Sequence, residues 1–128
     1  MWNSRADRDR SDRTERWRRE DAASRLIDEV PALQTLVLSL REIRETFLVS
    51  GSERKQHVIV SRAAALFEIA CSEPKCQDGG HDLTLDVLHN LRKGNTEFAS
   101  SSECRGTMGN MGCRRELHYS ARATYTPR

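Results

Sequence analysis

The stretches CSEPKC (residues 71–76) and CRGTMGNMGC (residues 104–113) decide how this chain folds. Each stretch begins and ends with a cysteine, and 27 residues separate the two stretches. Two local pairs of cysteines with a long insert between them are typical of a tetrahedral metal site, because the chain can fold back and bring both pairs around one ion. We therefore expect the two stretches to meet in space.

The expected ion is zinc, which thiolates bind in a tetrahedral arrangement. Its predicted ligands are the four cysteines of the chain: Cys71, Cys76, Cys104 and Cys113. A closed shell of four cysteines leaves no coordination position for a substrate, so this zinc would be structural. Unrelated buried thiols and a pair of disulfides are also compatible with the cysteine count.

His81 is an alternative ligand. It follows Cys76 in the stretch CQDGGHDLT (residues 76–84) and could replace one thiolate, which would make an open, catalytic site conceivable. A simpler interpretation is that His81 and Asp82 shape the turn at the entrance of a helix. The remaining histidines have no spacing typical of a catalytic triad, and the sequence has neither a recognisable nucleophile motif nor a glycine-rich phosphate loop.

Glycines and basic residues flank both cysteine pairs. Four thiolates on one Zn²⁺ leave a local charge of about −2, so the site needs N–H donors and nearby cations. A glycine at every third position of the second stretch lets the backbone bring N–H groups close to sulfur, although an ordinary flexible hairpin loop would also explain these glycines. The residues concerned are Gly106, Gly109 and Gly112, with the cations Lys75, Arg105, Arg114 and Arg115.

The composition is lean in apolar residues and nearly balanced in charge. Hydrophobic residues make up 37% of the chain and charged residues 31%, and the net charge is +2. This balance excludes an obligate polybasic or polyacidic protein, and no apolar run is long enough to cross a membrane. Metal binding can supply on the order of 10 kcal/mol, which a core this lean needs. The N-terminus lacks the apolar core of a secretory signal, so we expect a cytoplasmic location, where disulfides are rare.

The chain is expected to divide into an arm and one domain. Residues 1–30 hold eight arginines and eight acidic residues, which is typical of a solvated helix or a disordered arm. We expect residues 1–20 to form this charged arm, flexible or helical, and residues 21–126 to form a single zinc-stabilised α+β domain. Within the arm, Trp17 is the residue that could anchor onto a partner.

The hydrophobic pattern predicts two helices and four strands. The expected order is a helix at 21–30, strands at 33–45 and 57–70, a helix at 82–94 capped by Asp82 and stopped by Gly94, a strand at 95–103, and a last strand with Leu117, Tyr119, Ala121, Ala123 and Tyr125 on its core face. The predicted fold class is therefore α+β, with a four-stranded antiparallel sheet packed on two helices and a zinc-ribbon-like metal site joining the two halves.

Two regions of this assignment also allow a helix. In residues 33–47, apolar side chains alternate as in a strand, but Leu33, Leu40 and Phe47 also recur every seven residues. In residues 57–70, the alanine run favours a helix, and one continuous strand needs a bulge or kink near Arg62.

The quoted residues support a resemblance. With FEIACSEPKCQDGGHDLT, LHNLRKG and ECRGTMGNMGCRRELHYSARATY, the chain resembles small uncharacterised bacterial proteins that carry C-x4-C-x4-HDLT and a later glycine-spaced cysteine pair in a zinc-ribbon-like setting. The resemblance covers roughly residues 56–126. It implies the metal site and the fold, and it implies no activity.

The function expected from these features is that of a zinc-stabilised, cytoplasmic binding or adaptor module for a protein or a nucleic acid. The case for nucleic acid rests on the basic residues after position 101, but alternation places Tyr119 and Tyr125 on the core face, away from a base. A metal-dependent or thiol-redox enzyme is a second hypothesis, and a structural subunit that oligomerises through residues 21–48 is a third. No membrane partner is expected.

Overall fold

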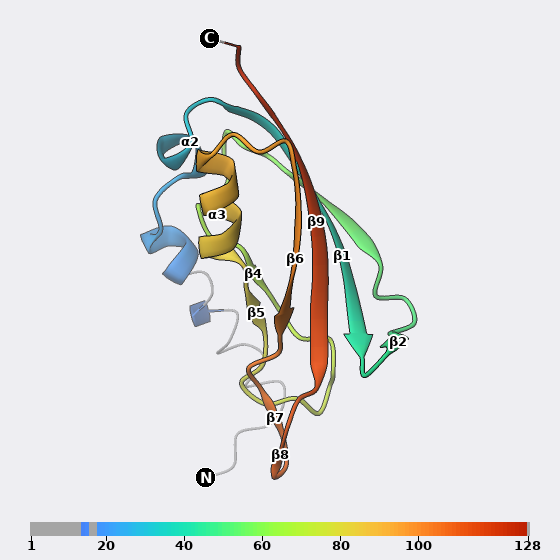
Figure 1. Ribbon diagram of the computed structural model, residues 1–128. Coiled ribbons are helices and arrows are strands. Elements are labelled where there is room, and N and C mark those ends of the chain that lie inside the picture. Colours follow the sequence, from blue (N-terminus) through green and yellow to red (C-terminus); the bar gives the residue numbers. More distant parts are fainter. Residues whose placement is uncertain (1–13, 16–17, 128) are drawn as a thin grey trace.

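The centre of the molecule is a twisted antiparallel sheet (Figure 1). The computed structural model describes residues 14–15 and 18–127. Its elements are α2 (Leu26–Glu29), β1 (Leu33–Arg44), β2 (Phe47–Leu48), β3 (Arg54–Val58), β4 (Glu68–Ile69), β5 (His81–Asp82), α3 (Thr84–Arg92), β6 (Glu97–Glu103), β7 (Thr107–Met108), β8 (Met111–Gly112) and β9 (Arg115–Tyr125). The α+β class and the antiparallel sheet are as predicted.

The sheet has five strands, whereas the sequence predicts four. The order is β2-β1-β9-β6, and β3 also pairs with β1, beside β2. After β1 the chain turns back and runs along the same edge of β1, first as β2 and then as β3. The two strands are separate because residues 50–52 bulge out of the sheet between Leu48, which lies opposite Ile43, and Arg54, which lies opposite Leu40. The Ser52 hydroxyl fills the gap by bonding to the backbone of Glu42, accepting from its N–H at 3.1 Å. β2 and most of β3 therefore lie in residues 47–56, where the sequence prediction has no strand.

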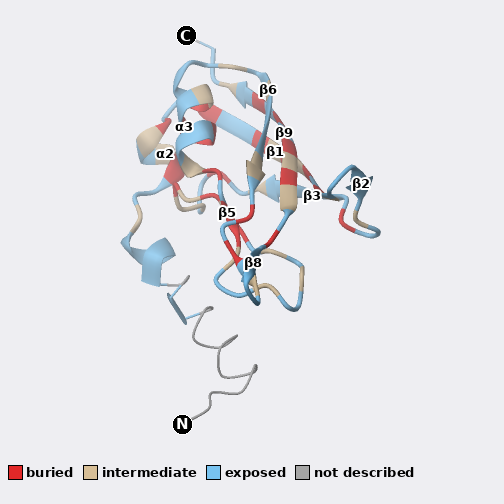
Figure 2. Ribbon diagram, turned by 60° about the horizontal axis from the view of Figure 1, so that its bottom comes forward, coloured by how far each residue is buried: buried red, intermediate tan, exposed pale blue. Residues whose placement is uncertain are grey.

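β1 and β9 form the longest pair of strands in the sheet. One face of this pair is turned to the core, and the other is the open face of the sheet. Their register runs from Leu33 opposite Tyr125 to Arg44 opposite Arg115. Alternate residues of both strands are buried, as the sequence pattern predicts (Figure 2). α2 and α3 lie on the core face, and the other face of the sheet carries polar side chains. Among the buried core residues are Leu36, Leu38, Leu40, Leu117, Tyr119, Ala121 and Ala123.

The helix predicted at 82–94 is α3, with shorter bounds. Asp82 does not occupy the N-cap position, which Leu83 takes, but its carboxylate accepts a hydrogen bond from the Thr84 N–H at 3.0 Å. Gly94 has φ of +76° and ends the helix as expected, because a left-handed residue there carries no Cβ penalty. The predicted apolar face is buried in the core.

The single strand predicted over 57–70 is wrong. β3 ends at Val58, and a tight turn follows in which Ala63 N–H donates to the Ile59 carbonyl at 2.9 Å. The chain then leaves the sheet, and β4 begins only at Glu68. The physical reason is that the small residues after Arg62 allow the chain to turn away from β1 and bury Ala65 and Phe67 in the core.

The helix predicted over 21–30 is divided. Residues 18–22 are helical, and α2 begins again at Leu26. Between them Arg25 bridges to Ala64, and the Leu26 N–H donates to the Ala63 carbonyl at 2.9 Å. These long-range backbone bonds replace the helical bonds that local propensity favours. Leu26 is nevertheless buried in the core as expected.

Part of the expected arm at residues 1–20 lies outside the described residues. Trp17 is one of the residues outside them. In the described part, Arg19 of the helical segment 18–22 is ion-paired with Glu68 at 2.9 Å, which ties this segment to β4. No helix in the described part of the chain is long and apolar enough to span a membrane.

Candidate metal centre

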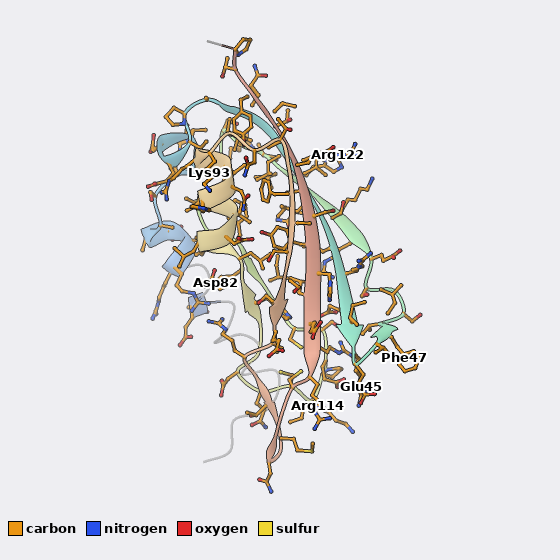
Figure 3. The ribbon with its side chains drawn as sticks, in the orientation of Figure 1. Glu45, Phe47, Asp82, Lys93, Arg114 and Arg122 are labelled. Atoms are coloured by element: carbon orange, nitrogen blue, oxygen red, sulfur yellow. The ribbon has the colours of Figure 1, made fainter. Side chains whose placement is uncertain are left out.

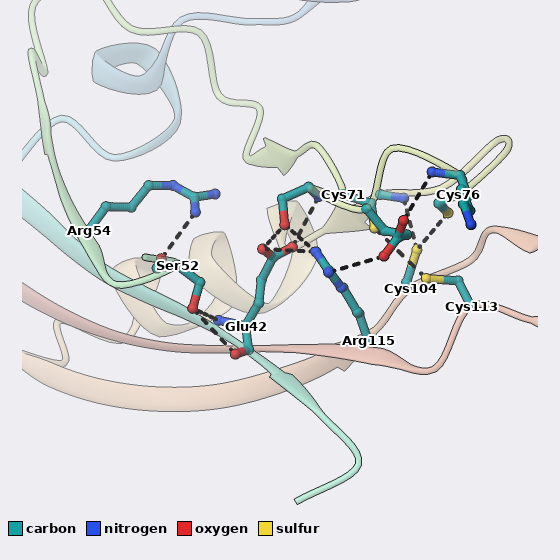
Figure 4. Close-up of polar contacts among 12 residues, drawn as sticks. Glu42, Ser52, Arg54, Cys71, Cys76, Cys104, Cys113 and Arg115 are labelled. Atoms are coloured by element: carbon teal, nitrogen blue, oxygen red, sulfur yellow. Dashed lines mark hydrogen bonds and ion pairs between the residues drawn. The ribbon is translucent and has the colours of Figure 1, made fainter. Parts of the chain in front are cut away.

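The four cysteine sulfurs meet at one end of the sheet (Figure 4). All four Sγ atoms lie within 4.8 Å of one another; Cys71 and Cys113 are 3.8 Å apart and Cys76 and Cys104 are 3.6 Å apart. Sulfurs at the corners of a tetrahedron with zinc–sulfur bonds of about 2.3 Å would lie about 3.8 Å apart. All four cysteines are free thiols. The distances therefore fit a tetrahedral ion of the size of zinc.

Two loops supply the sulfurs, and each loop is anchored by strands. The first loop leaves β4 and returns as β5, and these two strands pair through Ile69 opposite His81. The second loop connects β6 to β9. Gln77 and Thr107 join the two loops, because each N–H donates to the other's carbonyl, at 2.8 and 3.0 Å. The predicted meeting of the two cysteine pairs is thus built from backbone hydrogen bonds as well as sulfur.

The second loop is itself a small hairpin. β7 and β8 pair through Thr107 opposite Gly112, and the chain enters and leaves through Cys104 and Cys113. The Cys104 N–H donates to the Arg115 carbonyl at 2.9 Å, and the Cys113 N–H donates to the Gly106 carbonyl at 2.8 Å. The first bond fixes Cys104 to β9, and the second closes the hairpin between Cys113 and Gly106.

Two glycines let the loops approach the sulfurs closely. A Cβ at Gly106 would lie 2.2 Å from Cys76 Sγ, and a Cβ at Gly79 would lie 2.3 Å from the same sulfur. Gly112, in contrast, has nothing within 4 Å of such a Cβ. Among the glycines singled out by the sequence, only Gly106 is required by the site, and the spacing contained no signal for Gly79.

The backbone around Cys104 stabilises a thiolate. The N–H groups of Gly80 and Gly106 both donate to its Sγ at 3.4 Å. Burial alone would raise the pKa of the Cys104 thiol, but these two donors, together with hydrogen bonds from the Cys76 and Cys71 thiols, lower the pKa.

The thiols of the first loop need a cation to ionise. Burial raises the pKa of Cys71 to about 12 and also raises the pKa of Cys76. A coordinated metal cation reverses this effect, because it deprotonates the thiols that bind it. The four sulfurs and their surroundings are thus suited to a metal cation rather than to free thiolates.

Of the four predicted cations, Arg115 is the one held in a network beside the site. Its guanidinium lies 3.2 Å from Glu73 and 3.8 Å from the carboxylate of Glu42. The side chains of Lys75, Arg105 and Arg114 are exposed.

Glu42 is a buried site residue that sequence reasoning missed. Its side chain is fully buried, and its carboxylate accepts hydrogen bonds from the Ser72 N–H at 3.2 Å and from the Ser72 hydroxyl (Figure 4). Ser72 also accepts a hydrogen bond from Arg115. This Glu42–Ser72–Arg115 network fastens the loop of Cys71 to β1 and β9. A signal was available, because alternation puts Glu42 on the core face with Leu38 and Leu40.

The structure does not bring His81 into the cysteine cluster. The cluster of metal-ligating side chains found among the described residues consists of the four cysteines. His81 lies in β5 with 1% of its surface exposed, and neither ring nitrogen has a hydrogen-bond partner in the described part of the chain. Burial lowers the pKa of His81, which keeps its ring neutral at physiological pH.

Comparison with family models, with curated proteins and with solved structures found no match to this chain. The resemblance to zinc-ribbon-like bacterial proteins therefore stays a prediction.

Proposed function

We propose that this protein is a cytoplasmic binding module that holds one structural zinc ion on Cys71, Cys76, Cys104 and Cys113. The observation that carries the proposal is the cluster of four sulfurs within 4.8 Å of one another. Four cysteines satisfy the preferred coordination of zinc, so the ion would supply stability and no open position for a substrate.

The position of the cluster supports a structural role. It joins a loop that follows β4 to the hairpin that precedes β9, two parts of the chain that are 27 residues apart in the sequence. Gly80 and Gly106 donate to sulfur, and the Glu42–Ser72–Arg115 network fixes one loop to the sheet. Such surroundings orient ligands and offset their negative charge, as expected around a structural zinc site.

The exposed end of the β1–β2 hairpin favours a protein as the partner. Phe47 and Leu48 are adjacent, and 71% and 48% of their surfaces are exposed. Large apolar side chains at an exposed tip are typical anchors for a protein partner. Figure 3 shows Phe47 and Glu45 at this tip, away from the helices. The tip also bears on the hypothesis of a structural subunit. Because β1 is paired on both sides, oligomerisation through residues 21–48 by strand pairing would have to use β2.

Metal analysis of the purified full chain tests the proposal. We expect about one zinc per chain, and we expect a strong chelator to remove the ion and unfold the protein, as followed by circular dichroism. If zinc leaves without loss of structure, the structural role is wrong, and the metal-dependent or thiol-redox enzyme becomes the better hypothesis.

The partner class is tested separately. We expect Phe47→Ser to abolish recovery of a protein partner from the cell of origin while zinc content stays unchanged. Binding of generic DNA or RNA that falls steeply with added salt would instead support a nucleic-acid partner. Sedimentation at several concentrations would detect self-association through β2.

A further inference from the structure

The open face of the sheet carries a hollow that the metal site does not use. Its volume is about 810 Å³, and its lining residues come from β1, the chain leading into β3, β6 and β9. Pockets for small molecules have volumes of about 300–1,000 Å³. The hollow lies on the side of the sheet opposite α2 and α3, so a ligand there would contact neither the helices nor the cysteines.

Short side chains in the middle of the sheet create this hollow. Ser39 lies opposite Ser120, and Ser120 lies opposite Ala99, so one row across three strands has almost no side-chain volume. The rows that bound the hollow are larger. Val37, Arg122 and Glu97 bound one end, and Ile43, Glu116 and Glu103 bound the other. The hollow is therefore a shallow, open depression with a floor of hydroxyl and methyl groups.

Two cations reach into this space without a carboxylate partner. Lys55 lies opposite Ser39, and Arg41 is two residues further along β1, so the two are diagonal neighbours on one face. Among the described residues neither has an ion pair, whereas nearby His118 is paired with Glu116 and Arg122 with Glu97. Glu53 also lines the hollow. Arg54 lines it as well, so the lining holds three basic side chains and one carboxylate, and this net positive charge beside serine hydroxyls is a favourable setting for an oxyanion.

We propose that this hollow binds a small phosphate-bearing molecule of about the size of a mononucleotide. The planar guanidinium group of Arg41 would bind the phosphate by donating hydrogen bonds to two of its oxygens at once. Lys55 would add a second charge, and the hydroxyls of Ser39 and Ser120 would donate to the same oxygens. This role goes beyond the proposed binding of a protein at the β2 tip.

The surroundings favour a small ligand over a nucleic-acid strand. A polynucleotide needs a continuous basic track, but Glu97 stands at one end of the hollow, and Glu103 and Glu116 stand at the other. A single strand also needs aromatic side chains for stacking, and the aromatic side chains of β6 and β9 lie on the core side, where Phe98 packs edge-on against Tyr119.

Calorimetric titration of the zinc-loaded full chain at low ionic strength tests the proposal. The probes are inorganic phosphate, pyrophosphate, adenosine 5′-monophosphate, adenosine and a single-stranded RNA oligonucleotide. We expect saturable binding of the phosphate-bearing probes and none of adenosine. We expect Arg41→Gln and Lys55→Gln each to weaken binding by about tenfold or more, because each removes a charge-assisted contact.

Two further variants separate a built site from general attraction. Ala99→Leu fills the hollow without changing charge and should abolish binding, with zinc content and near-ultraviolet circular dichroism unchanged. Arg122→Gln removes the same charge in the row that borders the hollow, but Arg122 is not among the residues that line it and is already paired with Glu97, so affinity should change by no more than about twofold. Figure 3 shows Arg122 on the side of the sheet away from α3.

Three results would overturn the proposal: no saturable binding of any phosphate-bearing probe, an equal loss in Arg41→Gln and Arg122→Gln, or RNA bound more tightly than the mononucleotide. Zinc content is measured on the same samples. A protein with one zinc that binds no phosphate would overturn this inference alone, and one that binds phosphate without zinc would overturn the metal proposal alone.

Discussion

The two ends of this molecule are built on different principles. Around α3 the core buries leucines, with Leu38 fully enclosed and Leu36 and Leu91 at 1% exposure. At the other end, in the two cysteine-bounded loops, the buried apolar residues are Cys104 and Cys113. Burial of apolar surface can stabilise the first end, whereas the second depends on sulfur, hydrogen bonds and charge.

This difference shows how a chain with few apolar residues can form one domain. The β1–β9 pair crosses from one end to the other, so the leucine core and the cysteine cluster share the same two strands. We expect each end to respond to its own kind of substitution, so that a change at one end leaves the chemistry of the other end intact.

The largest effect is expected from Cys104→Ser. Cys104 is buried and accepts two backbone N–H groups, and a serine cannot replace a thiolate ligand of zinc. We expect zinc stoichiometry to fall to near zero and the free energy of unfolding to fall by on the order of 10 kcal/mol, the full energy of metal binding, which leaves most of the chain unfolded. Metal analysis and denaturant unfolding measure both. If this variant keeps its zinc and its stability, Cys104 is not a ligand of a structural zinc ion.

A core substitution at the other end should leave the metal in place. Leu38→Ala opens a cavity at a fully buried position, and we expect a loss of about 2–5 kcal/mol in the free energy of unfolding. Zinc stoichiometry should stay at that of the unsubstituted protein under native conditions. Release of zinc without global unfolding would show that the two ends are not separable.

Gly106→Ala tests how closely the loops pack. The added Cβ would lie 2.2 Å from Cys76 Sγ and 2.6 Å from the Gly79 Cα, so the loops must move apart. We expect zinc affinity, measured by competition with a chromogenic chelator, to fall about 10–100-fold. Gly112→Ala is the matched control, because nothing lies within 4 Å of its Cβ and affinity should not change. Equal effects of the two substitutions would refute the close packing.

The smallest effect is expected from Glu42→Gln. The amide keeps an acceptor for Ser72 but removes the charge that faces Arg115, and we expect a loss of about 1–2 kcal/mol in the free energy of unfolding. Hydrogen exchange should accelerate in the loop of Cys71 and change little in α3. Glu116→Gln, on the open face, is the control and should cost about 0.5 kcal/mol or less. Equal rates of hydrogen exchange in the loop of Cys71 in the two variants would contradict the role of Glu42 in holding this loop.

Much of the sheet and the cysteine site could be predicted because their signals are local. β9 alternates without interruption, β1 shows the same pattern from Leu36 to Leu40, and Gly94 marks the end of α3. The cysteine spacing indicated that both pairs would meet. The signals in β9, β1 and α3 lie in residues close together in the sequence, and each cysteine pair is itself a local signal.

The parts that could not be predicted depend on contacts between distant residues. Arg25 leaves the expected helix because it bridges to Ala64, and the bulge that divides β2 from β3 depends on Ser52 and Glu42. The role of Gly79 is visible only once Cys76 Sγ has a position in space. Glu42 is the exception, since an acid on the core face of an alternating strand is a signal that the sequence does contain.

X-ray absorption at the zinc edge of the purified full chain tests the central claim most directly. The account predicts one zinc per chain with four sulfur neighbours at about 2.3 Å and no nitrogen or oxygen neighbour. A spectrum with a histidine nitrogen in the shell, or a pure folded protein with no zinc, would contradict it.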